Sequence, residues 1–125
     1  MEEMREFFDI AKDIYRTLST IISRVYPIIA DEGSLKPFII YERDGLTIDR
    51  CKDGSYQGNF SFSVKIVSDG YYEGLGYAQS VVDSVLKMNS TVEGLNYSDI
   101  TLSSAIEEYS DDSYIQSLSF NIEIN

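Results

Sequence analysis

The stretch FSFSVKIVSDGYYEGLGYAQSVVDSVL, residues 60–86, changes its hydrophobic period part-way along, and this change decides the fold. Its first residues alternate between apolar and polar side chains, which is typical of a strand with one buried face. After the turn Ser68-Asp69-Gly70 the apolar residues recur at helical spacing instead. The apolar positions of the strand are Phe60, Phe62, Val64 and Ile66, and those of the helix are Tyr77, Val81, Val85 and Met88. A strand followed directly by an amphipathic helix therefore predicts a helix packed on a sheet.

The N-terminal part of the chain predicts a first, long amphipathic helix. Its apolar residues recur at spacings of four and three: Phe7, Ala11, Ile14, Leu18, Ile21 and Val25. Pro27 disfavours helical geometry at Tyr26, so we expect this helix to end near residues 25–26. Residues 28–36 then form a connection, with turn chemistry at Asp31-Glu32-Gly33-Ser34.

Three strand-like runs follow before the second helix. Residues 38–43 (FIIYER) and 46–51 are separated by Asp44-Gly45, and an Asp-Gly pair between two such runs predicts a hairpin turn. Residues 52–58 are polar, contain two glycines and are expected to form the tip of a further hairpin. Residues 60–66 form the third and cleanest strand of this group.

The second half of the chain predicts the later helix and a closing hairpin. Ser68 or Asp69 could cap the helix, and Gly74 and Gly76 weaken its first turn, so it is expected to begin late. Residues 100–106 and 117–124 alternate as strands, and EEYSDD, residues 107–112, is the expected turn between them. The apolar face of the last strand is Leu118, Phe120, Ile122 and Ile124.

These elements define one α+β domain over residues 1–125, in the order α-β-β-β-α-β-β. Alternating strands favour one mainly antiparallel sheet with a wet face and a dry face. The two helices are expected to cover the dry face. The length is that of a single domain with a core of its own.

Composition limits the possible partners and compartments. The net charge is −11, with −3 over residues 1–60 and −8 over residues 61–125, which argues against binding to nucleic acid or an anionic membrane. The acidity could serve solubility, or it could form a surface that repels phosphate or meets a basic partner. The single cysteine favours a reducing cytosol, no apolar run reaches the roughly 18 residues of a membrane span, and the acidic start is unlike a signal peptide.

Residues that could carry chemistry are few, and each has a simpler structural explanation. The chain has no histidine, so Cys51 lacks the usual base, although Arg50 and Lys52 flank it. The turn residues Glu107, Glu108, Asp111 and Asp112 could collect a hard cation, but they lack the ligand spacing and glycine of a calcium loop. Gly74-Leu75-Gly76 lacks the rest of a nucleotide-binding motif. We therefore expect no enzyme activity, no catalytic residue, no cofactor and no metal site.

Tyrosine is the dominant aromatic residue, with ten tyrosines and no tryptophan. Seven of them lie at predicted turns or strand ends: Tyr41, Tyr56, Tyr71, Tyr72, Tyr97, Tyr109 and Tyr114. Tyrosine is enriched at protein interfaces, but it also packs at sheet edges in monomers. Both interpretations remain open from the sequence.

Three phrases resemble the tail-terminator, or tail-completion, proteins of long-tailed phages and prophages. They are YPIIADEGSLKPFIIYE at 26–42, FSFSVKIVSD running into GYYEGLGYAQSVVDSVL at 60–86, and EEYSDDSYIQSLSFNI at 107–122. The resemblance covers nearly the whole chain as pattern and order of elements, and it identifies no individual binding residue.

The resemblance implies a structural subunit that assembles, usually as a hexameric ring, on the head-proximal end of the tail tube. Its partners would be further copies, tail-tube proteins and head-connector proteins, first in the cytoplasm and then in the virion. We expect contacts through residues 52–58 and 31–36, since exposed loops commonly carry them. Two rivals are an acidic DNA-mimic inhibitor of a nucleic-acid-binding protein and a cystatin-like or nuclear-transport-factor-like sheet that holds a small apolar ligand.

Overall fold

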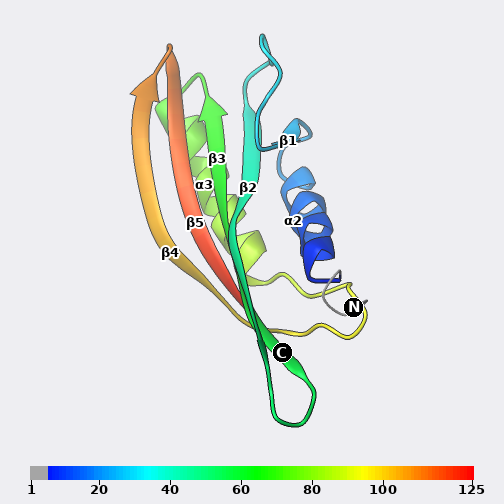
Figure 1. The fold of residues 1–125 in the computed structure, drawn as a ribbon. Helices are drawn as coiled ribbons and strands as arrows, with labels where there is room; N and C mark the ends of the chain where they lie inside the picture. Colours follow the sequence, from blue (N-terminus) through cyan, green and yellow to red (C-terminus); the bar gives the residue numbers. More distant parts are fainter. Residues whose placement is uncertain (1–5) are drawn as a thin grey trace.

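The computed structural model describes residues 6–125, which fold as a curved five-stranded sheet with two helices on one face (Figure 1). The elements are η1 (Phe7–Asp9), α2 (Ile10–Ser19), β1 (Val25–Pro27), β2 (Phe38–Arg50), β3 (Tyr56–Ser68), α3 (Tyr71–Leu86), β4 (Tyr97–Ser110) and β5 (Ser113–Ile124). The strand order is β1-β2-β3-β5-β4, in which β1 and β2 are parallel and all other pairs are antiparallel. The predicted fold class and element order are confirmed.

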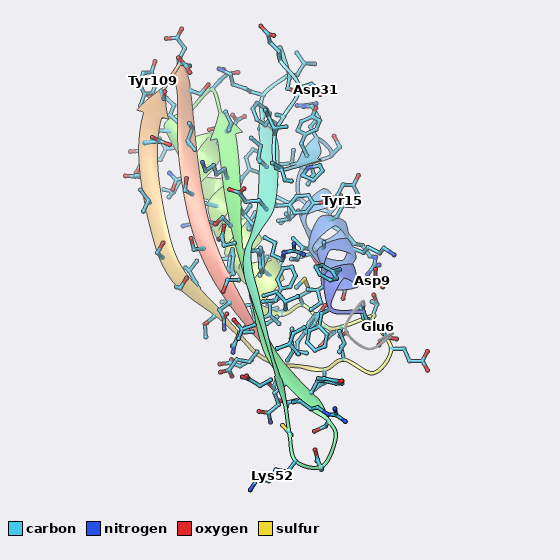
Figure 2. The ribbon with its side chains drawn as sticks, viewed as in Figure 1. Glu6, Asp9, Tyr15, Asp31, Lys52 and Tyr109 are labelled. Carbon is cyan, nitrogen blue, oxygen red and sulfur yellow. The ribbon has the colours of Figure 1, made fainter. Side chains whose placement is uncertain are left out.

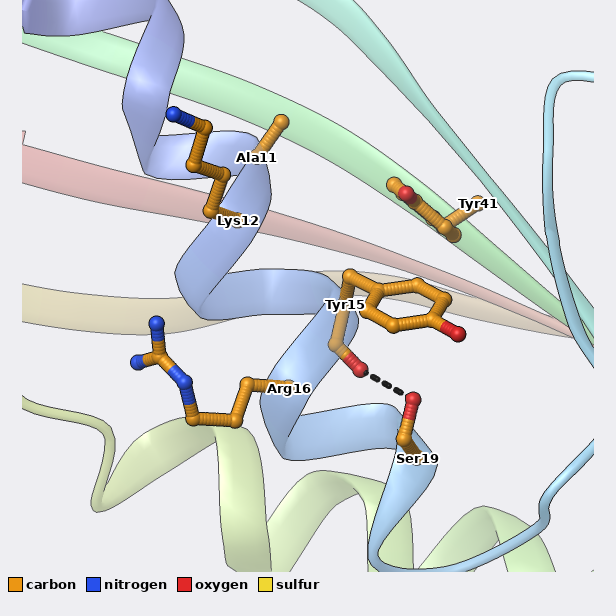
Figure 3. Close-up of a pocket in the computed structure, with 6 residues that line it drawn as sticks. All are labelled: Ala11, Lys12, Tyr15, Arg16, Ser19 and Tyr41. Carbon is orange, nitrogen blue, oxygen red and sulfur yellow. Dashed lines mark hydrogen bonds between the residues drawn. The ribbon is translucent and has the colours of Figure 1, made fainter.

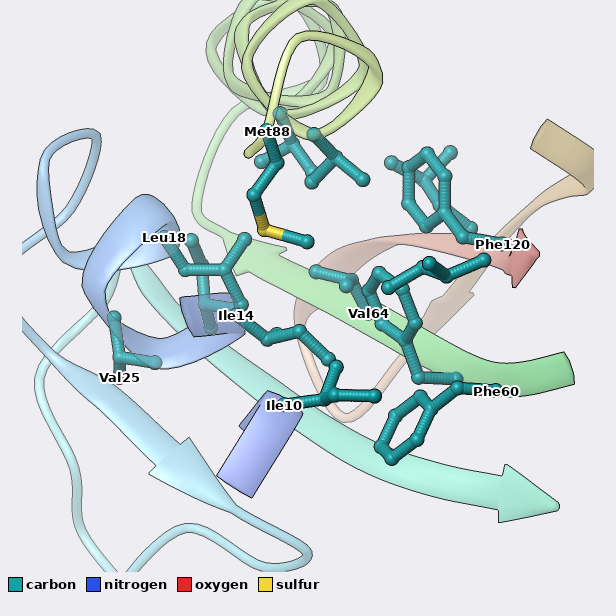
Figure 4. Packing of buried hydrophobic residues seen from close by; sticks show 14 of the residues in the cluster. Ile10, Ile14, Leu18, Val25, Phe60, Val64, Met88 and Phe120 are labelled. Carbon is teal, nitrogen blue, oxygen red and sulfur yellow. The ribbon is translucent and has the colours of Figure 1, made fainter. Parts of the chain in front are cut away.

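The core lies between the helices and one face of the sheet (Figure 4). Alternate residues of β3 and β5 point into it, and the predicted inward faces of both strands are confirmed by side chains that are at most 3% exposed. Phe62 and Phe120 stack across the two strands with ring centroids 5.2 Å apart. Ile10, Ile14 and Leu18 of α2 and Val81 and Val85 of α3 close the other side. Burying several large side chains in one place supplies the main stabilisation of the fold.

The first helix is shorter than its apolar pattern predicts, and its predicted end near residues 25–26 is wrong. It ends at Ser19, where the hydroxyls of Ser19 and Thr20 donate to the carbonyls of Tyr15 and Thr17, both at 2.7 Å. Such local bonds compete with helix continuation. Ile22 and Val25 still reach the core, but through a loop and the short parallel strand β1. Their burial explains why the helical spacing extends beyond the helix.

The predicted hairpin at Asp44-Gly45 is also wrong, because β2 runs through both residues. The strand makes an irregular step there, with Arg43 pairing with Phe62 and Gly45 with Ser61, so that Asp44 is the extra residue of a bulge. Asp44 accepts a hydrogen bond from Ser63 on the neighbouring strand. The two predicted strands are therefore one. Three strands still precede α3, as predicted, because β1, which was not predicted, is one of them.

Helix α3 begins at Tyr71 rather than late, and both glycines lie inside it. Its N-cap is Gly70, with no side-chain cap from Ser68 or Asp69. The buried Ser68 hydroxyl instead donates to the carbonyl of Gly70 at 2.8 Å and lies directly beneath Gly74. A Cβ at Gly74 would come within 2.5 Å of that hydroxyl, so the glycine permits close packing of helix on strand.

Substitution of the two glycines by alanine is expected to have opposite effects. Gly74→Ala should lower the free energy of unfolding by about 1–2 kcal/mol, because it displaces the buried Ser68 hydroxyl. Gly76→Ala meets nothing within 4 Å and should raise it by about 0.5–1 kcal/mol through helix propensity. Urea unfolding measures both. Adding Ser68→Ala to the Gly74→Ala variant removes the clashing hydroxyl and should restore part of the lost stability. Failure of this rescue, or equal effects of the two glycine substitutions, would contradict this explanation.

The closing hairpin is longer than predicted and its turn is shorter. Strands β4 and β5 pair up to Ser110 and Ser113, leaving only Asp111 and Asp112 in the turn, with φ of 50° and 58°. Glu107 and Glu108 therefore lie on β4, on opposite faces, and the six-residue acidic turn is wrong. A bulge between Leu102 and Ser104 shifts the alternation, which places Ile106 on the open face. The predicted alternation of 100–106 fails at that bulge.

Candidate functional site

The sheet face opposite the helices carries most of the acidic strand residues, together with an apolar group at one end that consists of Phe38, Ile40, Val67, Ile106 and Ile115. Its two central strands contribute a ladder in which Ser61 donates to Asn121 at 3.0 Å and Asn121 donates to Asn59 at 3.1 Å. Strand pairing and the Ser63–Asp44 bond place these carboxylates on the open face: Glu42, Asp44, Asp49, Asp99, Glu108 and Glu123. Among the described strand residues, only Lys65 adds a positive charge there. This face would repel phosphate or attract a basic surface.

The apolar loop, residues 28–35, follows the edge strand β1 and exposes three large side chains. Ile28, Ile29 and Leu35 are 71%, 76% and 71% exposed. Ile28 has a φ of +66°, which is a strained conformation for a β-branched residue. The N–H of Ile28 donates to the backbone carbonyl of Tyr41 at 2.8 Å. The N–H of Ile29 donates to the carbonyl of Pro27 at 2.7 Å, and this bond closes a γ-turn centred on Ile28. Exposed apolar side chains on strained backbone are typical of a binding surface.

The other predicted contact segment, residues 52–58, lies at the opposite end of the molecule (Figure 2). Lys52 marks the tip of the β2–β3 hairpin there, and Asp31 and Tyr109 lie at the far end. The turn is closed by the N–H of Cys51, which donates to Ser55 at 2.7 Å. Cys51 is thus a half-buried turn residue with a free thiol, not a strand residue. Residues 56–58 already belong to β3, so the exposed tip is shorter than predicted.

Strand β4 forms the other edge of the sheet and is largely exposed over fourteen residues. Within residues 6–125 no strand pairs with its outer backbone groups, and β4 contains no proline or lysine to discourage pairing. An open groove of about 460 Å³ separates it from α3. The groove is lined mainly by apolar residues: Leu75, Ala78, Val82, Leu102, Ala105 and Leu118. A small ligand held between α3 and the sheet would lie in this groove, at the sheet's edge.

A second groove, of about 480 Å³, is lined by α2 and by Tyr41 of β2 (Figure 3). Tyr15 and Tyr41 flank it with ring centroids 6.3 Å apart. Lys12 and Arg16 line the same groove from α2. Among the lining residues that the structure describes, no nucleophile lies beside a base.

Asp13 is a buried carboxylate that sequence periodicity places outside the apolar stripe of α2. It is 1% exposed and accepts from the Thr91 N–H at 3.1 Å, the Tyr97 hydroxyl at 2.6 Å and the Arg16 guanidinium at 3.0 Å. The Thr91 hydroxyl also donates to it. Burial alone would raise the pKa of Asp13, but these bonds outweigh burial and lower it. The Asp13 clamp joins α2 to the segment between α3 and β4.

The seven tyrosines highlighted by the sequence do not gather in one place. Four of them do, at the end of the sheet where β4 turns into β5: Tyr71, Tyr72, Tyr109 and Tyr114. Tyr72 is 82% exposed and Tyr109 is 60% exposed. Tyr71, Tyr109 and Tyr114 line a pocket together with Glu107, a residue that the sequence pattern places in a turn. This combination requires the β4 bulge and the start of α3, neither of which the sequence pattern located.

The remaining candidate motifs have structural roles. Among residues 6–125 no three acidic or cysteine side chains are arranged to hold a metal ion. The Gly74-Leu75-Gly76 segment lies inside α3, with Gly74 packed on Ser68, so it forms no phosphate-binding loop. No helix in this described part is long and apolar enough to cross a membrane.

The fold is similar to that of a solved virion protein. One chain of a structure described as "Virion of native gene transfer agent (GTA) particle" matches with a TM-score of 0.66, covering 89% of this chain and 90% of that chain. The shared feature is the fold. Sequence identity is 14%, and neither a family model nor a curated protein matches the sequence.

Proposed function

We propose that this chain is a structural subunit of a tailed-phage or prophage particle, which forms a tail-terminator-like ring. The ring would cap the tail tube and join tail to head, assembling in the cytoplasm and remaining in the virion. The observation that carries this proposal is the end-to-end similarity in fold to a chain of a gene transfer agent particle. The sequence resemblance to tail terminators supports the same role, including a hexameric ring.

The two edges of the sheet suit head-to-tail assembly. One edge carries the apolar loop after β1, and the other carries β4 with its apolar groove. Contacts between two different surfaces of identical subunits generate rings when the rotation closes. The exposed isoleucines of one copy and the groove of the next have matching chemistry. The acidic open face, if it lined the ring, would let DNA pass without binding it.

A direct test uses the purified chain and a tail-tube protein encoded by a neighbouring gene. Light scattering and negative-stain electron microscopy should reveal rings and should find them at the ends of tubes that stop growing. A chain that remains monomeric at high concentration and leaves tube length unchanged would refute the proposal.

The acidic open face also favours a second candidate, an inhibitor that mimics DNA. Glu42→Gln, Asp49→Asn and Glu123→Gln together would remove three carboxylates from that face without touching the apolar loop or the core. A DNA mimic would then lose inhibition of its target enzyme. A ring subunit would still assemble and cap tubes.

A further inference from the structure

A small pocket lies at the end of the sheet, between the start of α3 and the β4–β5 turn. Its volume is about 230 Å³. The residues that line it are Tyr71, Glu107, Glu108, Tyr109, Tyr114 and Gln116. Apart from Gln116, which also borders the α3–β4 groove, none of them belongs to that groove or to the apolar loop, so the pocket is largely separate from the proposed ring contacts.

Tyrosine rings form the walls of this pocket. Tyr114 lies edge-on to Tyr109, with centroids 4.9 Å apart, and edge-on to Tyr71, at 5.9 Å. Tyr72 extends the array, 5.3 Å from Tyr71. Rings held by one another in this way present fixed π faces, and a π face attracts a cation within about 6 Å.

A carboxylate completes the pocket. Glu107 accepts from the Tyr71 hydroxyl at 3.0 Å and from the buried Gln116 amide at 3.0 Å. Both donors are neutral, and no ion pair among residues 6–125 involves Glu107. A carboxylate has about four acceptor positions, so two donors leave room for a further pair of hydrogen bonds.

The surroundings increase the negative potential. Glu108, Asp111 and Asp112 lie on the same hairpin end. Lys36 lies at this end of the hairpin, but its ammonium is already bonded to Asp69 at 3.2 Å and to the carbonyl of Asp112 at 3.1 Å. The raised pKa of Tyr71, which is caused first by its bond to Glu107, agrees with a field that favours positive charge.

We propose that this pocket binds an arginine side chain presented by a partner protein. A guanidinium is planar, so it can stack on a tyrosine ring while it donates two hydrogen bonds to the free positions of Glu107. Lysine offers only a point charge and cannot stack. Arginine and tyrosine are also the residues enriched at protein interfaces. The inference does not depend on ring formation.

The test is an NMR titration of the ¹⁵N-labelled chain with N-acetyl-arginine amide and with N-acetyl-citrulline amide, its neutral isostere. Arginine amide should shift the amide signals of residues 71–72, 107–109 and 114–116, and citrulline amide should not. Glu107→Gln, which keeps the hydrogen bonds to its neighbours, should weaken arginine binding about tenfold. Glu123→Gln, at the other end of the same hairpin, is the matched control and should bind as the original chain does.

Tyr109→Leu provides an independent check, because it keeps apolar area on an exposed side chain but removes the π face. It should also weaken binding several-fold. Equal binding of arginine and citrulline amides, or unchanged binding by Glu107→Gln, would overturn the proposal. Equal affinity for N-acetyl-lysine amide would overturn the assignment of arginine.

Discussion

Asp13→Ala is expected to lower the free energy of unfolding by about 3 kcal/mol, a large fraction of the stability of a small domain. The substitution removes the acceptor of the half-buried Tyr97 hydroxyl and of the Thr91 N–H and hydroxyl, and it leaves a hole where the buried carboxylate lay. The Tyr97 hydroxyl, which is partly shielded from water, then retains part of its desolvation penalty, and several bonds to a charged acceptor are lost at once. Urea unfolding measures the loss. Asp9→Ala, which removes an exposed pair with Lys12, should change stability by less than about 0.5 kcal/mol.

The Asp13 clamp also predicts a pH dependence. The folded-state pKa of Asp13 is lower than its ordinary value, so its contribution is fully present above the unfolded pKa and is lost as pH falls through the folded pKa. Stability should therefore decline below about pH 4, and Asp13→Asn should remove that part of the decline.

Tyr97→Phe tests the same clamp from its other side. It should also destabilise the chain, and the double variant with Asp13→Asn should lose less than the sum of the two single losses, because the residues share one hydrogen bond. The clamp would contribute little if the losses in unfolding free energy of the two single variants added up to that of the double variant. The same would follow if Asp13→Asn left the decline of stability in acid unchanged.

The fold class was predictable because the two central strands alternate cleanly. Phe60 to Ile66 and Leu118 to Ile124 place every second side chain in the core, and the period of two has no other simple explanation. The second helix was predictable for the corresponding reason, although two glycines obscured its start. Gly74 would weaken an isolated helix, but here it permits close contact with Ser68, and tertiary packing outweighs propensity.

The predicted hairpin and helix end are wrong because the same local sequence is compatible with two different structures. Asp44-Gly45 suits a tight turn and also suits a bulge, and the choice depends on a long pairing with β3 that no local pattern reveals. Ile22 and Val25 keep the spacing of α2 because the same core receives them after the helix has ended. Burial alone therefore does not define a helix boundary.

The candidate sites were less predictable than the fold, since they depend on residues far apart in the chain. Asp13 looks like a solvated helix residue until Thr91 and Tyr97 are brought to it. The tyrosine pocket likewise joins residues of α3 and both strands of the closing hairpin. The sequence suggested that the tyrosines mark interfaces, but it could not indicate which four meet. Exposure of the apolar loop was partly foreseen, as a contact segment at residues 31–36.

Ile28→Gly together with Ile29→Ser is expected to weaken ring assembly at least 100-fold while leaving the isolated subunit as stable as before or more stable. Two isoleucines buried at a contact contribute about 3–5 kcal/mol, which corresponds to that change in affinity. In the isolated subunit both side chains are more than two-thirds exposed, so little packing is lost. Glycine also adopts the φ of +66° without strain, which should add about 1 kcal/mol of stability.

A variant that assembles less well but unfolds no more easily would show that the apolar loop is a contact surface and does not stabilise the subunit itself. Sedimentation velocity measures assembly, and urea unfolding of dilute subunit measures stability. Leu86→Ser, an exposed apolar side chain at the end of α3, is the control and should assemble normally. If the loop variant forms rings as readily as the original chain, the apolar loop is not a contact between copies. If instead the isolated variant unfolds more easily, the strained turn at Ile28 stabilises the fold itself, and its exposure has no bearing on assembly.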